Sequence, residues 1–175
     1  MKSRTKPNLK PLRPEFSSGP CAKRQGWNPA EIIERAYLGR SHRAKEPRSQ
    51  IAEVIRLTKD LLEIPETYRV GLVPASNTGA FEMTLWNLLG KIPVDIFAWE
   101  NFGMTWAEDI IKHMKIKDYR LISAHYGLLP DLTLIRDNSD VCFTWNGTTA
   151  GVRVPNADWI SEERAGLVLC DATSA

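Results

Sequence analysis

The sequence predicts an α/β fold with a mostly parallel sheet flanked by helices. After Tyr68, short apolar runs alternate with stretches of helical periodicity. The runs are apolar on both faces, which is typical of parallel strands covered on both sides. The chain has 175 residues, 43% hydrophobic and 25% charged, so it can bury a substantial core.

Three segments are expected along the chain. Residues 1–14 contain prolines and basic residues without periodicity, which predicts an extended arm. Residues 15–66 form a helical segment, and residues 67–175 are the first part of an α/β domain. The chain stops at Ala175, shortly after a strongly apolar run, and we expect it to be an amino-terminal piece of a longer protein.

Two helices are predicted in the second segment. Asn28 is a favourable N-cap and Pro29 suits the first helical position, so a helix is expected from there to Gly39. A longer helix is predicted from Ser49 to Glu63, where apolar residues recur at helical spacing before Pro65.

The alternating part of the chain supplies the strands and the helices between them. Helices are expected over Gly79–Leu89 and Met104–Lys115. The apolar runs that predict strands are Arg69–Val73, Val94–Trp99, Tyr119–Ser123, Asp140–Thr144 and Gly166–Cys170.

Charge and cysteine content exclude several classes of protein. Lys and Arg total 23 against 21 acidic residues, so no strong basic surface indicates nucleic-acid binding. No apolar run is long enough for a membrane span, and the amino end has no secretory h-region, so a cytoplasmic protein is expected. Cys21, Cys142 and Cys170 are widely spaced, two of them in predicted buried strands, which favours reduced thiols over disulfides or a metal site.

In parallel α/β sheets, ligands bind at the carboxyl ends of the strands. This rule directs attention to the loops that follow the predicted strands. They are Pro74–Thr78, Glu100–Thr105, Trp145–Gly151 and Asp171–Ala175.

The first of these loops can bind an anion. Ser76, Asn77 and Thr78 bring N–H groups and hydroxyls to a helix amino terminus, and Gly79 allows close approach of the backbone. The loop is neither a dinucleotide fingerprint nor a nucleoside triphosphate P-loop. Ordinary N-capping by Ser or Asn explains the same residues equally well.

Three further residues have both a structural and a functional interpretation. Asp171 follows a buried strand and needs a cationic or hydrogen-bonding partner, such as a pyridinium nitrogen, or else it caps the loop. Thr148 lies among short polar residues that suit a flat ligand or a turn. Trp106 is either a core residue or a stacking platform.

A basic run, RSHRAKEP, joins the two early helices. Such a run is usually a solvated turn. Arg43, with His42 beside it, could instead bind a phosphate or a carboxylate.

Taken in order, these pieces resemble the amino-terminal part of the phosphoserine aminotransferases. These are pyridoxal-phosphate (PLP) enzymes of fold type I in the class V aminotransferase group. The resemblance extends from Glu15 to Ala175, and the combination of SSGP with SHR is its most specific part. The motifs are FSSGPCAKR, RSHRAKEP, ASNTGAFEM, the Trp106 segment, NGTTAGV and CDATSA.

The resemblance implies a role for each site residue. The cofactor phosphate would be held at Asn77 and Thr78, and Trp106 would stack on the pyridine ring. Thr148 would bind the phenolic oxygen of the ring, and Asp171 would pair with its nitrogen and sustain the chemistry of the cofactor. His42 and Arg43 match the element whose Arg helps to bind the phosphate of the substrate.

The resemblance also implies the reaction. It is a transamination in serine biosynthesis, in which 3-phosphohydroxypyruvate and glutamate are converted to phosphoserine and 2-oxoglutarate. The enzyme would be a homodimer. A second role in pyridoxine synthesis is implied in bacteria. The family's Schiff-base lysine would lie beyond Ala175, so the 175 residues alone are expected to be inactive.

Two alternatives stay open. Many family members have Arg where this chain has Thr78, and that Arg serves the substrate phosphate. Another class V aminotransferase, using alanine or serine with glyoxylate, is therefore the first alternative. The second is a non-catalytic fragment that binds a phosphorylated ligand or a partner subunit.

Overall fold

A computed structural model describes residues 25–175 of the chain. The predicted arm, the FSSGP motif and Cys21 lie outside the described residues. Contacts divide the chain into two units, of which the first ends at Gly71 and the second is Leu72–Ala175.

The first unit contains helices α1, Pro29–Arg35, and α2, Lys45–Leu61. Asn28 is the N-cap of α1, as predicted, and its side chain accepts a hydrogen bond from Ala30 N at 3.0 Å. The helix ends well before Gly39 because Ala36 is already extended, with ψ at 133°.

Helix α2 begins before the predicted Ser49. Pro47 lies in its first turn, where a missing N–H costs no helical hydrogen bond. On the exposed surface of the helix, Arg56 forms ion pairs with Glu53 at 2.7 Å and with Asp60 at 2.5 Å. These pairs at helical spacing add modestly to helix stability.

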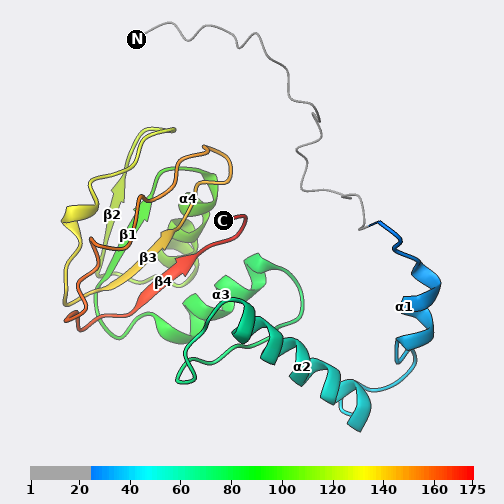
Figure 1. Ribbon diagram of the computed structural model, residues 1–175. Helices are drawn as coiled ribbons and strands as arrows, with labels where there is room; N and C mark the ends of the chain where they lie inside the picture. The colour runs from blue at the N-terminus through cyan, green and yellow to red at the C-terminus, as the bar shows by residue number, and fades with distance from the viewer. Residues whose placement is uncertain (1–24) are drawn as a thin grey trace, which may run out of the picture. The chain divides into compact units, whose positions relative to one another are not determined.

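The second unit is built on a four-stranded, all-parallel sheet in the order β2-β1-β3-β4, which confirms the predicted α/β class (Figure 1). The two interior strands are buried along their whole length, whereas the edge strands alternate. The strands are β1 Val94–Ala98, β2 Tyr119–Ser123, β3 Asp140–Thr144 and β4 Val168–Asp171.

The prediction of a strand over Arg69–Val73 is wrong. These residues are irregular, and the run crosses the boundary between the two units at Gly71 and Leu72. Among the described residues no strand pairs with them, and Leu72 is 57% exposed. An apolar run forms a strand only where another strand satisfies its backbone groups.

Helices cover one face of the sheet. Helix α3, Asn77–Leu88, packs near β4, and α4, Asn101–Glu108, packs on β1 and β3. A π-helical turn, Asp109–His113, continues α4. A helix was predicted here over Met104–Lys115, and the observed one starts at Asn101 and ends at His113. The core on this face consists of Phe81, Leu85, Val94, Ile96, Trp106, Ala107, Ile110, Cys142 and Leu169.

Irregular segments, rather than long helices, cover the opposite face. Trp159 packs edge-on against Phe97 and Phe143, with ring centroids 5.4 and 5.0 Å away. Ile135, beyond the short 3₁₀ turn Leu132–Leu134, also packs there. Both faces of the interior strands β1 and β3 are therefore covered, as their apolar runs predict.

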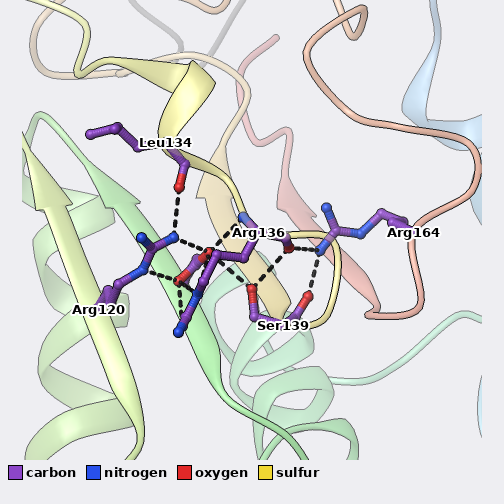
Figure 2. A network of polar contacts seen from close by, with 6 residues as sticks. Arg120, Leu134, Arg136, Ser139 and Arg164 are labelled. Carbon is purple, nitrogen blue, oxygen red and sulfur yellow. Dashed lines mark hydrogen bonds and ion pairs between the residues drawn. The ribbon is translucent and has the colours of Figure 1, made fainter.

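A polar cluster fixes the amino-terminal end of the sheet (Figure 2). Asp95, fully buried on β1, accepts hydrogen bonds from the guanidinium groups of Arg120 and Arg136, with closest distances of 2.7 Å to each. Ser139 Oγ donates to the same carboxylate at 2.9 Å. Arg164 donates to the carbonyl oxygens of Ser139 and Gly166, at 2.5 and 3.0 Å. One carboxylate thus joins β1 to β2 and to the loop before β3.

Within the described part of the chain, Cys142 and Cys170 are both free thiols. Cys142 is buried on the interior strand β3, and burial, with Cys170 and Asp171 nearby, raises the pKa of its thiol well above the usual range. Cys170 is exposed, contrary to the expectation of a buried strand: it pairs with Phe143 of β3 but lies outside the cluster of apolar side chains that buries Phe143. No helix within residues 25–175 has the length and apolar character needed to cross a membrane.

Candidate active site

A pocket lies where the carboxyl ends of β3 and β4 meet the amino-terminal parts of α3 and α4. Its volume is about 80 Å³, and a second, more open hollow of about 340 Å³ shares Asn77, Asp171 and Thr173 with it. The position is the one expected for ligands of parallel sheets. The lining residues are Asn77, Thr78, Phe102, Trp106, Thr144, Asn146, Thr148, Asp171, Thr173 and Ser174.

The amino terminus of α3 forms one wall. Ser76 is its N-cap, and its Oγ accepts a hydrogen bond from Gly79 N at 3.2 Å. Ala75, just before the cap, has φ at 91°, a conformation that residues with a side chain rarely adopt and that is often found near functional sites. Asn77 and Thr78 follow in the first turn, where the helix dipole favours an anion.

Asp171, the last residue of β4, is hydrogen-bonded to an aromatic side chain of the opposite wall. Its Oδ2 accepts from Trp106 Nε1 at 3.0 Å. Trp106 is only 2% exposed, and its ring lies 4.9 Å from that of Phe81 on α3. Trp106 is therefore a core residue that also lines the pocket, so the two interpretations of it are compatible.

The other oxygen of Asp171 organises the loop that follows. Its Oδ1 accepts from the backbone N and the hydroxyl of Thr173, at 2.9 and 2.6 Å. The carbonyl oxygen of Thr173 accepts in turn from Asn146 Nδ2 at 3.1 Å and from Thr148 Oγ1 at 3.5 Å. Asp171 thus acts as the loop cap that the sequence suggested, and this network joins the loops after β3 and β4.

Two buried side-chain oxygens at the pocket have no hydrogen-bond partner among the described residues. They are Thr144 Oγ1 and Asn146 Oδ1. Buried polar atoms usually have a partner, so an unpaired pair beside a pocket is consistent with a polar ligand or ordered water there.

The structure brings five of the predicted residues to one pocket. Asn77, Thr78, Trp106, Thr148 and Asp171 all line it, although they come from four separate segments. Their roles toward a cofactor stay predictions.

The other two predicted residues lie in the first unit. His42 and Arg43 are exposed in the turn before α2, where Ser41 Oγ accepts from Arg43 N at 3.2 Å. The solvated-turn interpretation therefore describes their local structure. Their role in binding a substrate stays a prediction.

The sequence placed Glu100 at the start of the predicted loop Glu100–Thr105 but assigned it no role. This residue follows β1, is 2% exposed, and caps α4 by accepting from Gly103 N at 2.7 Å. Its other oxygen accepts from Thr149 Oγ1 at 2.9 Å. An acidic residue placed directly after the apolar run VDIFAW is the signal that could have identified it.

Comparisons with known proteins show what the chain is similar to. No protein-family model matches the chain. Two curated proteins named phosphoserine aminotransferase, from Methanosarcina mazei and Methanosarcina barkeri, are each 54% identical to it over 170 residues. The matches cover 97% of the chain and 46% of each relative. Over nearly its whole length the chain is therefore similar to phosphoserine aminotransferases, and it spans about half the length of these relatives.

Proposed function

We propose that the whole protein is a PLP-dependent phosphoserine aminotransferase. As a cytoplasmic homodimer in serine biosynthesis, it would transfer the amino group of glutamate to 3-phosphohydroxypyruvate. The products would be phosphoserine and 2-oxoglutarate, and the reaction would be reversible. The main support is the pocket at the carboxyl ends of β3 and β4, in a chain 54% identical to proteins of that name. A second role in pyridoxine synthesis belongs to the same proposal.

The residues of the pocket fit PLP chemically. A phosphate suits the first turn of α3, where the helix dipole is favourable and hydroxyls are close by. A protonated pyridine nitrogen suits the carboxylate of Asp171, to which no Lys or Arg side chain within residues 25–175 forms an ion pair. The unpaired oxygens of Thr144 and Asn146 add polar groups at the same place.

Four residues would then hold the cofactor. Asn77 and Thr78 would bind its phosphate, Thr148 its phenolic oxygen, and Asp171 its ring nitrogen. When bound, PLP supplies an electron sink for the negative charge that develops on the substrate's α-carbon. Asp171 would keep a proton on the ring nitrogen, because an adjacent negative charge favours the protonated form of a base.

Trp106 would contribute a flat apolar surface and restrain Asp171. Its N–H is already directed at Asp171 Oδ2, which limits the carboxylate to one orientation. Because Trp106 is itself packed against Phe81, the restraint extends from the core of the domain to the pocket. The carboxylate is thereby oriented before any ligand arrives, which reduces the entropy lost on binding.

The reaction is tested by measuring turnover of the whole protein with PLP and glutamate. We expect amino transfer to 3-phosphohydroxypyruvate, with a much higher kcat/KM than to glyoxylate. Preference for glyoxylate would assign the protein to the other class V aminotransferases. Binding of phosphorylated ligands without any turnover would support a non-catalytic role instead.

The role of Asp171 is tested separately. Asp171→Ala should lower kcat far more than it lowers PLP affinity, because the lost interaction stabilises charge that develops during the reaction. Asp131→Ala, which removes a carboxylate that caps the Leu132–Leu134 turn, is a matched control and should leave kcat unchanged. A near-normal kcat in Asp171→Ala would mean that this residue only caps its loop.

A further inference from the structure

Glu100 connects two walls of the pocket without lining it. One carboxylate oxygen accepts from Gly103 N in the first turn of α4, at 2.7 Å, and the other accepts from Thr149 Oγ1, at 2.9 Å. Glu100 is 2% exposed and its hydrogen bond with Gly103 N is buried, whereas the bond with Thr149, an exposed residue, is part-buried. Both are bonds to a carboxylate with little contact with water, which strengthens them relative to fully exposed ones.

The two segments that Glu100 joins carry different pocket residues. Helix α4 carries Phe102 and Trp106, and the loop after β3 carries Asn146 and Thr148. Thr149 is 49 positions from Glu100 in the sequence, so this contact depends on tertiary structure. A shift of the loop relative to α4 would change the spacing between Trp106 and Thr148.

The loop after β3 lies very close to Glu100 at Gly147. A Cβ added at Gly147 would lie 2.7 Å from Cγ of Glu100 and 2.9 Å from Nε1 of Trp99. Trp99 Nε1 also donates to the carbonyl oxygen of Val152 at 3.1 Å, at the far side of the same loop. Two consecutive buried residues, Trp99 and Glu100, therefore hold the loop, and only glycine fits at position 147.

We infer that Glu100 is a positioning residue that sets the spacing between Trp106 and Thr148 and thereby the affinity of the pocket for PLP. This inference rests on the proposed function for its ligand. A capping role alone does not require the second oxygen, since Gly103 N occupies only Oε1. The hydrogen bond from Thr149 is thus the part of the arrangement that specifically concerns the loop.

The decisive variant is Thr149→Val, which removes the hydroxyl and leaves the cap of α4 intact. We expect the Kd of the whole protein for PLP to rise by about tenfold, the effect of losing one hydrogen bond to a charged group. The visible circular dichroism of bound PLP should change, because it reports the orientation of the ring. Thr149→Ser keeps the hydroxyl and should restore both values.

Thr133→Val is the matched control. It removes a hydroxyl-to-carboxylate hydrogen bond of the same kind, 2.6 Å from Thr133 Oγ1 to Asp131 Oδ1, in a turn that does not line the pocket. This variant should bind PLP as the unmodified protein does. An equal rise of Kd in Thr133→Val and Thr149→Val would overturn the inference, because the effect would then be general destabilisation.

A readout without cofactor separates this inference from the proposed function. In the ligand-free protein, Thr149→Val should speed amide hydrogen exchange at Gly147 and Gly151, whose N–H groups bond within the loop at 2.7 Å each. If the unmodified protein fails to bind PLP, the proposed function fails whatever the exchange result. If the unmodified protein binds PLP but Thr149→Val leaves the Kd for PLP unchanged, the positioning role of Glu100 is wrong and the proposed function still stands.

Glu100 itself is tested by a pair of substitutions. Gln can accept from Gly103 N through its carbonyl oxygen and donate to the Thr149 hydroxyl, so Glu100→Gln should largely preserve PLP affinity. Glu100→Ala loses both contacts and should weaken it more than Thr149→Val does. Equal PLP affinities for Glu100→Ala and Glu100→Gln would contradict the inference.

Discussion

The indole N–H of Trp106 on α4 donates a hydrogen bond to Oδ2 of Asp171 at the end of β4, over 3.0 Å. The two residues are 65 positions apart in the sequence, and both line the pocket. Trp106 is buried against Phe81, so the core of the domain fixes the orientation of a carboxylate in the candidate site.

Replacing Trp106 by Phe tests this relationship. Phe keeps an aromatic ring but removes the N–H and some buried volume, so we expect a loss of about 2–3 kcal/mol in the free energy of unfolding. The measurement is urea denaturation of the whole protein, combined with PLP affinity. Trp159→Phe, which loses a hydrogen bond to Asn156 O on the other face of the sheet, should destabilise the fold without altering PLP affinity. Equal PLP affinity in both variants and the unmodified protein would argue against a role for Trp106 at the pocket.

Asp95→Asn tests the cluster at the opposite end of the sheet. The substitution leaves Arg120 and Arg136 around a neutral group, so we expect a loss on the order of 3 kcal/mol. Glu53→Gln, which breaks an exposed pair with Arg56, is the comparison and should have little effect. An unfolding midpoint in urea that is the same for Asp95→Asn and the unmodified protein would contradict the importance of this cluster.

The same cluster predicts how stability depends on pH. Burial by itself raises the pKa of Asp95, but hydrogen bonds from Arg120, Arg136 and Ser139 outweigh this effect and hold its pKa well below the usual range. The ionised carboxylate therefore stabilises the fold above the unfolded-state pKa of about 3.9, and this contribution is lost as the pH falls toward the folded-state value. Below about pH 4, the difference in unfolding free energy between Asp95→Asn and the unmodified protein should narrow.

Gly166→Ala should disturb the loop that leads into β4. A Cβ at this position would lie 1.8 Å from the carbonyl oxygen of Ser139, so the backbone would have to move. We expect a loss of about 3 kcal/mol or more in the free energy of unfolding, or failure to fold. At Gly71 an added Cβ meets nothing within 4 Å, and Gly71→Ala should be tolerated. Comparable thermal midpoints for the two variants would show that the loop before β4 can adjust.

Arg43→Ala tests which substrate the whole protein uses. If Arg43 binds the phosphate of phosphoserine, its loss should lower kcat/KM for phosphoserine by about tenfold or more and leave an unphosphorylated amino acid nearly unaffected. Because Thr78 supplies no second guanidinium, Arg43 would contribute most of the binding of the substrate phosphate. We therefore expect the loss of kcat/KM to exceed about tenfold. Arg40→Ala, in the same basic run, is the control. Equal losses for both amino acids would indicate that Arg43 binds the shared carboxylate or is structural.

The predictions from sequence were most accurate where local pattern dominates. The strands Tyr119–Ser123 and Asp140–Thr144 have the predicted bounds, and Asn28 and Ser76 are the N-caps of α1 and α3. Apolar runs and caps depend on neighbouring residues only, so they can be read directly. The strand predicted over Arg69–Val73 failed because its apolar pattern carries no information about a pairing partner.

The candidate site was predicted in part. Five of the proposed residues meet at one pocket. The loops after β3 and β4 were identified because parallel strands present their carboxyl ends at one edge, whereas Asn77 and Thr78 were identified by the capping pattern of α3 and not by a preceding strand. Glu100 was assigned no role because its partner, Thr149, is distant in sequence. The position of Glu100 after an apolar run indicates a helix cap, but no local pattern shows that its second oxygen also accepts a hydrogen bond from a distant loop.

By itself the sequence determined the α/β class and the four strands of the sheet, and it also predicted a fifth strand that is not formed. These features follow from hydrophobic periodicity and capping, which are local. Only the tertiary structure decided that β1 lies between β2 and β3, that Asp95 is shared by Arg120 and Arg136, and that Trp106 donates to Asp171. Such contacts join residues tens of positions apart, and their geometry depends on the packing of the whole domain.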